Sequence, residues 1–210
     1  MISIIIYIGI LLLLLNTLLF SQRFFIDKKP LRIFIIYLFI TLIIQITARV
    51  LLNNKIPNIY LSHFYFISQF LLLSLFYKKI IKSKTKTKMI TITLFVVLAS
   101  ITYLFISNPS IFYKFSLFEV VICSIPLVIY SIFYFMESFG FENKKYLFFN
   151  SGLFIYLLSS TLIFSSGNLM ENLPKDINRI VWVLNASLYL VYQILIFIEW
   201  YKNFRKSKLT

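Results

Sequence analysis

Seven long apolar runs, separated by short polar turns, constrain this chain more than any other feature of its sequence. Each run is close to or above the roughly 20 residues that an α-helix needs to cross the hydrocarbon core of a bilayer. Because backbone polar groups inside lipid must be satisfied within the segment, we predict an all-α fold, a polytopic bundle of seven transmembrane helices. The runs cover residues 2–20, 33–52, 59–77, 89–106, 111–136, 146–164 and 177–200.

The composition supports a membrane protein with a single domain. Of the 210 residues, 60% are hydrophobic and 13% are charged, whereas a soluble domain has about 45–50% apolar and about 25% charged residues. The turns between the runs are too short to contain a soluble module. We therefore expect one transmembrane domain over residues 1–210, with no attached kinase or nuclease.

Lysine and arginine are distributed unevenly over the turns. Sixteen of the 21 basic residues lie in the turns after the first, third and fifth runs and in the tail, and four lie on the opposite side. By the positive-inside rule, this predicts an outside N-terminus and a cytoplasmic C-terminus in a bacterial inner membrane. The net charge of +14 is thus explained without nucleic acid. The most basic segment is expected to contact anionic lipid headgroups through Lys82, Lys84, Lys86 and Lys88.

Polar side chains inside the runs recur at helical spacing. Thr41, Gln45 and Arg49 are four residues apart in the second run, so they share one helix face. Polar groups are costly in lipid, and we therefore expect them to face an interior shared by helices two, three, five and seven. The candidate ligand-binding residues are Gln45, Arg49, Ser62, His63, Glu119, Asn185 and Tyr189.

Arg49 and Glu119 are the charged residues of this candidate pocket. At 1.5 Å per residue, they lie roughly 6 Å and 12 Å below the outer ends of their helices, so we predict an outward-facing pocket with these two as an ion pair. The sequence leaves two alternatives to this ion pair open. In one, Arg49 reaches the outer headgroups, and in the other, Glu119 is a neutral carboxyl bonded to a neighbouring helix. For His63, the alternative to ligand binding is simple packing near the interface.

The sequence argues against catalysis. His63 is the only histidine, so the chain cannot form an HExxH motif or a multi-histidine metal site. It contains no P-loop and no G-x-S-x-G motif, and its two aspartates, Asp27 and Asp176, both lie in turns. We therefore expect no enzyme activity, no metal and no cofactor.

Asn58, Tyr60 and His63 form an N…Y…H pattern at the start of the third run. With this motif and seven runs, the chain resembles the seven-helix input domains of bacterial membrane signalling proteins, and small bacterial membrane proteins that carry the motif where a helix opens. The resemblance implies a receptor or sensor module that needs a separate cytoplasmic or membrane protein partner for its output. A ligand in the pocket would then bias a kink that we predict at Pro126.

Two other functions remain possible from the sequence. The length and helix count are similar to those of seven-helix families that conduct sugars or vitamin ribosides, which suggests a small-solute transporter. Such a transporter needs a polar path to the cytoplasm, for which Gln69, Tyr192 and Glu199 are the candidates. The third possibility is a structural subunit of a larger membrane assembly.

Overall fold

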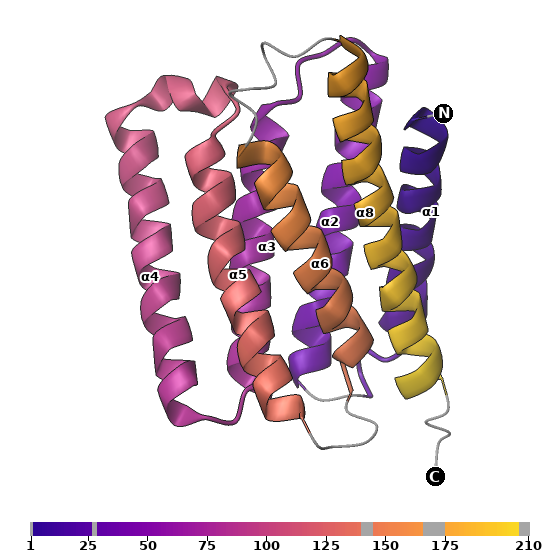
Figure 1. Cartoon of the computed structure of the whole chain (residues 1–210), viewed down its shortest axis with the longest axis vertical. Coiled ribbons are helices and arrows are strands. Elements are labelled where there is room, and N and C mark those ends of the chain that lie inside the picture. The colour runs from indigo at the N-terminus through magenta and orange to yellow at the C-terminus, as the bar shows by residue number, and fades with distance from the viewer. Residues whose placement is uncertain (1, 27–28, 140–144, 166–174, 206–210) are drawn as a thin grey trace.

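The computed structural model describes residues 2–26, 29–139, 145–165 and 175–205, which consist of helices and the turns between them (Figure 1). Seven helices in this part of the chain are long and apolar enough to span a membrane, which confirms the predicted seven-helix topology. A short 3₁₀ helix, η1, precedes α5. The elements are α1 (Ile2–Ser21), α2 (Lys29–Asn53), α3 (Tyr60–Ile80), α4 (Lys84–Ser107), η1 (Pro109–Tyr113), α5 (Leu117–Ser138), α6 (Leu147–Ser165) and α8 (Lys175–Asn203).

The predicted runs overlap these helices, and the helix ends lie within five residues of the predicted ends except at the start of α5. The helix begins at Leu117 and not at Ile111, so the predicted start is wrong. Residues 109–113 form η1 instead. The Ser116 hydroxyl then accepts a hydrogen bond from the Glu119 backbone N–H at 3.3 Å, which caps the new helix. Pro126 lies inside α5, and the helix continues on both sides of it.

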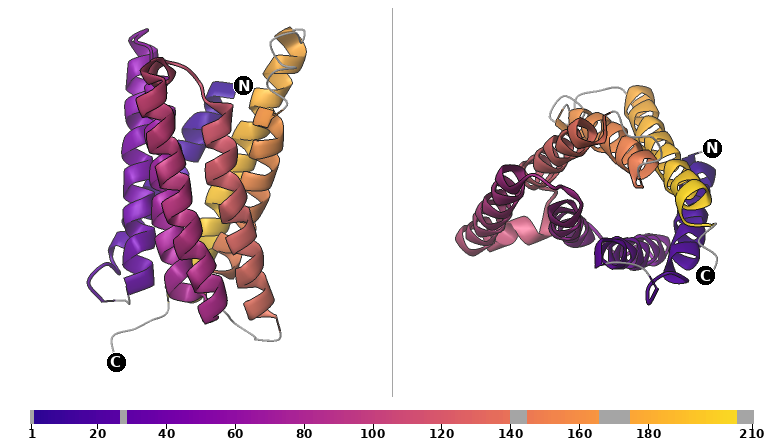
Figure 2. Two further views of the ribbon diagram at one scale, coloured as in Figure 1. Left: turned by 90° about the vertical axis from the view of Figure 1, so that its left-hand side faces the viewer. Right: turned by 90° about the horizontal axis from the view of Figure 1, so that it is seen from below.

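Six helices form a closed ring, and α4 lies outside it. In the ring α1 packs against α2, α2 against α3, α3 against α5, α5 against α6 and α6 against α8, which returns to α1 (Figure 2). Helix α4 packs against α3 and α5 from the outside. The interior is thus shared by more helices than the four expected from the sequence, because α1 and α6 also line it.

The lower half of the ring, in the orientation of Figure 1, contains a layer of packed phenylalanines. Phe34, Phe76 and Phe149 are fully buried, and their ring centroids lie between 4.5 and 5.9 Å apart. Beside them, Asn150 Oδ1 accepts hydrogen bonds from the Tyr77 hydroxyl at 2.5 Å and from the Ser131 hydroxyl at 2.8 Å. This layer joins α2, α3, α5 and α6 at the lower end.

Glu199 fastens the end of α8 to the beginning of α6. Its carboxylate accepts hydrogen bonds from the backbone N–H groups of Tyr146, Phe148 and Phe149, at 2.5, 3.0 and 3.4 Å. The first N–H groups of a helix have no partner within the helix, and the helix dipole favours a negative charge there. Glu199 is therefore a structural cap.

The two ends of the ring differ in charge. The turns at 22–26 and 81–83 and the end of α8 lie at the lower end, whereas the α2–α3 turn and the connection from α4 to α5 lie at the upper end (Figure 1). The described basic residues that follow α1, α3 and α5 therefore gather at the lower end, where α8 also ends. Helix α1 begins at the upper end (Figure 1).

Candidate ligand-binding site

The upper half of the ring contains a cavity of about 500 Å³ between α1, α2 and α8, with Tyr156 of α6 also on its wall. Cavities that bind small molecules typically measure about 300–1,000 Å³, so its size is suitable for a ligand. We call it the polar chamber. It is lined by Ser3, Ile6, Ile10, Gln45, Arg49, Leu52, Tyr156, Trp182, Asn185, Ala186 and Tyr189.

Two polar atoms on the wall of the polar chamber have no hydrogen-bond partner within the described residues. They are the buried Arg49 Nη2 and Asn185 Oδ1, and the buried Tyr189 hydroxyl beside them has Gln193 as its neighbour. Leaving a buried polar group unpaired costs about 1–3 kcal/mol, and native structures contain few such groups. Two of them on one cavity leave hydrogen-bonding capacity that a bound group can complete.

Arg49 gives the chamber a positive charge. Its guanidinium lies 4.8 Å from the ring centroid of Tyr7 on α1, a cation–π contact of about 0.5–2 kcal/mol that holds the side chain without neutralising it. The ion pairs found among the described residues do not include Arg49. The chamber therefore presents an uncompensated cation beside the Asn185 and Tyr189 side chains.

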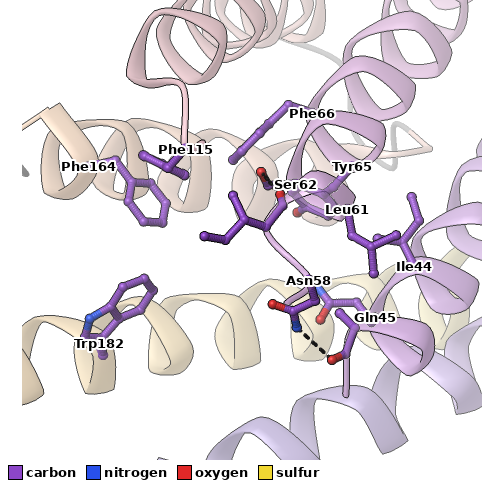
Figure 3. Close-up of a pocket in the computed structure, with 12 residues that line it drawn as sticks. Ile44, Gln45, Asn58, Leu61, Ser62, Tyr65, Phe66, Phe115, Phe164 and Trp182 are labelled. Atoms are coloured by element: carbon purple, nitrogen blue, oxygen red, sulfur yellow. Dashed lines mark hydrogen bonds between the residues drawn. The ribbon is translucent and has the colours of Figure 1, made fainter. Parts of the chain in front are cut away.

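A second cavity of about 290 Å³ adjoins the polar chamber, and Gln45 and Trp182 line both (Figure 3). Phe164 lies between Phe115 and Trp182, with ring centroids 5.6 and 6.0 Å from theirs. Across the cavity from these rings lie Leu61, Ser62 and Phe66 of α3 (Figure 3). We call it the apolar chamber, and the two chambers together the vestibule. The apolar chamber is lined by Ile44, Gln45, Ala48, Asn58, Ile59, Leu61, Ser62, Tyr65, Phe66, Phe115, Phe164 and Trp182.

A layer of tyrosines separates the vestibule from the phenylalanine layer below. The rings of Tyr156 and Tyr192 stack, with centroids 5.6 Å apart, and the hydroxyls of Tyr192 and Tyr37 are hydrogen-bonded at 3.1 Å. Gln69 Nε2 donates to the hydroxyls of Tyr37 and Tyr65 at 3.2 and 3.3 Å. These contacts connect α2, α3, α6 and α8, so the floor of the vestibule couples four helices.

The predicted Arg49–Glu119 pair is wrong. Glu119 Oε2 lies 2.5 Å from His63 Nδ1, and both side chains are buried, whereas Arg49 contacts Tyr7. Helix α3 packs between α2 and α5, so the nearest titratable partner for Glu119 is on α3. The depth estimate placed the residues at similar heights but carried no information on their angular positions. Glu119 is bonded to a neighbouring helix, which is the contact that one of the two alternatives expected.

The N…Y…H motif is accounted for by contacts at the start of α3. Asn58 Nδ2 donates to the Ala48 carbonyl at 2.8 Å, which ties the α2–α3 turn to α2. The Tyr60 ring stacks on Phe112 of η1 with centroids 5.9 Å apart. His63 stacks on the same phenylalanine at 5.9 Å and bonds to Glu119. The motif thus positions α3 against α2, η1 and α5.

Five of the seven candidate residues lie on the vestibule. Gln45, Arg49, Asn185 and Tyr189 line the polar chamber, and Ser62 and Gln45 line the apolar chamber. His63 and Glu119 do not. His63 instead lines a separate cavity of about 500 Å³ with Phe64, Ile67, Phe105, Pro109, Phe112 and Tyr113.

Sequence reasoning missed the contribution of α1 and α6. Tyr7 supports Arg49, and Tyr156 lines the polar chamber. Tyr7 is the only tyrosine in the first run, and this was the available signal. Nothing in the sixth run distinguishes Tyr156 from a residue that packs in the core.

Among the described residues, no group of three or more His, Cys, Asp or Glu side chains could hold a metal ion, and Cys123 is buried. Comparisons with protein-family models, with curated proteins and with solved structures find no match to this chain. The function must therefore be inferred from the geometry of the vestibule.

Proposed function

We propose that this chain is a receptor-like module of the bacterial inner membrane, which binds a small molecule or lipid in the vestibule from the extracytoplasmic side. The unpaired guanidinium of Arg49 beside Asn185 and Tyr189 is the observation that carries the proposal. A cation with neighbouring hydrogen-bonding groups in a partly apolar cavity recognises a ligand with an anionic head, because guanidinium bonds to carboxylate or phosphate are the strong ones. The proposed output is a separate protein partner.

The charge distribution supports the orientation in this proposal. The basic segments gather at the end of the ring opposite the vestibule, and the positive-inside rule assigns that end to the cytoplasm. Lys82, Lys84 and Lys88 are exposed there and are proposed to contact anionic headgroups. Lys86 differs, since its Nζ lies 3.6 Å from Glu137 Oε1.

Helix α8 is the proposed route of the signal. It supplies Trp182, Asn185 and Tyr189 to the vestibule, and further along it Tyr192 joins the tyrosine layer and Glu199 caps α6. A ligand shifts an equilibrium only through different affinities for two states. We propose that it does so by ordering the vestibule face of α8, in place of the route through Pro126 expected from the sequence.

Binding of a short carboxylate tests the proposal. Purified Trp200→Phe protein, in which Trp182 is the remaining tryptophan, is titrated with hexanoate while the fluorescence is recorded. Arg49→Gln should weaken binding roughly 10- to 100-fold, the range for a lost hydrogen bond to a charged group. Arg205→Gln is the matched control, because Arg205 lies over Tyr201 at 4.7 Å at the other end of the molecule. Equal affinities of Arg49→Gln and the parent would refute the proposal.

The alternatives are separated by two further assays. A small-solute transporter requires flux in reconstituted vesicles, and its cytoplasmic path would have to use Gln69, Tyr192 and Glu199, whose hydrogen bonds join helices to one another. A structural subunit requires no ligand, so its assembly should tolerate Arg49→Ala. Saturable hexanoate binding without flux supports the receptor.

A further inference from the structure

The two chambers differ sharply in chemistry, and together they indicate a class of ligand. We infer that the vestibule binds a single-chain amphiphile whose anionic carboxylate or phosphate head lies beside Arg49 and whose hydrocarbon chain extends into the apolar chamber. This inference rests on the proposed function and specifies its ligand.

The head is assigned to the polar chamber by charge. Among the described residues that line the two chambers, Arg49 is the only charged one, and none is an aspartate or glutamate. Glu119, the nearby buried acid, is bonded to His63 on the other side of α3. An ammonium group would therefore meet a cation without a counter-charge, which disfavours zwitterions such as amino acids.

The chain is assigned to the apolar chamber by its walls. Phe66, Phe115, Phe164 and Leu61 supply aromatic and aliphatic surface (Figure 3). Two polar side chains from the start of α3 on this wall are already engaged. Asn58 Nδ2 donates to the Ala48 carbonyl, and the Ser62 hydroxyl donates to the Ile59 carbonyl at 2.6 Å. What the chamber offers a ligand is chiefly apolar contact.

The boundary between the two chambers suits the place where the anionic head of such a ligand joins its hydrocarbon chain. Gln45 and Trp182 line both cavities, so one ligand can occupy the two at once. Tryptophan combines an apolar ring with a polar N–H and is suited to the place where a head meets a chain. The floor of stacked tyrosines limits how deep the ligand reaches.

The experiment compares chain-length series in two proteins. Affinities for butyrate, hexanoate, octanoate and decanoate are measured by Trp182 fluorescence in the Trp200→Phe background. Each buried methylene should tighten binding about fourfold in the parent. Ala48→Leu, which fills the apolar chamber, should flatten this dependence for the longer acids. Ala99→Leu on the exposed side of α4 is the matched control. Each acid partitions into detergent to the same extent for every variant, so this partition does not affect the comparison between variants.

The outcomes separate the inference from the proposed function. If affinity rises with chain length as steeply in Ala48→Leu as in the parent, the inference is overturned, even where butyrate binding still depends on Arg49. Loss of the Arg49 dependence for every acid overturns the proposed function as well. Decylamine binding as tightly as decanoate would refute the assignment of the head.

A second measurement does not depend on a filled cavity. Decanoate brominated at its terminal carbon should quench Trp182 on binding, and unlabelled decanoate should reverse the quenching. In Trp182→Phe protein, Trp200 should be unaffected, because it lies near the other end of α8. Equal quenching of both tryptophans indicates non-specific contact through the detergent and overturns the inference.

Discussion

The buried pair between His63 and Glu119 gives a test in which the structure and the sequence hypothesis disagree. The Nδ1 and Oε2 atoms are 2.5 Å apart, and the side chains are 3% and 1% exposed. Removing one member of such a pair leaves the other buried without its partner, which costs about 3–5 kcal/mol. Glu119→Ala should therefore lower the free energy of unfolding by about that amount. Glu119→Gln should cost less, since its amide retains a hydrogen bond.

Thermal unfolding of the purified protein measures the effect. For chains of this size, 1 kcal/mol corresponds to about 2–4 °C in Tm, so Glu119→Ala should lower Tm by roughly 6–20 °C. The double variant His63→Phe with Glu119→Leu should recover most of the loss, because apolar residues can replace a buried pair at little cost. The variant Glu119→Gln should bind hexanoate as the parent does, since Glu119 is not among the residues that line the vestibule. A strong loss of affinity with an unchanged Tm would instead support the Arg49–Glu119 pocket and refute the structural assignment.

Two further substitutions test the packing of α8. A Cβ at Gly152 would lie 3.0 Å from Tyr192 Cδ2 and 3.1 Å from Leu195 Cβ, so Gly152→Ala should force α6 and α8 apart and lower stability by about 1–3 kcal/mol in thermal unfolding. An unchanged Tm would show that the helices are less closely packed than described. Glu199→Ala removes the acceptor for three backbone N–H groups at the start of α6, and hydrogen exchange of residues 146–149 should accelerate while that of α3 does not. Equal protection of both helices would contradict the capping role.

The positions of the helices could be predicted from the sequence because the bilayer sets the length of an apolar run. The start of α5 could not be predicted, because residues 111–116 are mostly apolar and continue the apolar run. Only the capping hydrogen bond at Ser116 shows where the helix begins. Nor does the sequence show that Gly9 and Gly152 both lie against α8.

Part of the candidate site could be predicted from helical spacing. Helical spacing identifies which residues of one helix share a face, and this placed Gln45 with Arg49, and Asn185 with Tyr189, on one cavity. Spacing within a helix does not say which helices are neighbours. The closure of the ring by α1 against α8, supported by hydrogen bonds from Asn16 Nδ2 to Gln193, therefore could not be predicted.

Reaction of an introduced cysteine with charged reagents tests most directly whether the vestibule is an outward-facing, positively charged cavity. In a Cys123→Ala background, Asn185→Cys is exposed to membrane-impermeant thiosulfonates added outside intact cells, and Lys202→Cys serves as the cytoplasmic control. We predict that the cysteine at position 185 reacts from outside, faster with an anionic than with a cationic reagent, and that Arg49→Gln removes this preference. The cysteine at position 202 should react only after the membrane is opened. Labelling of position 185 only from the cytoplasmic side, or an anion preference that persists without Arg49, would contradict the account.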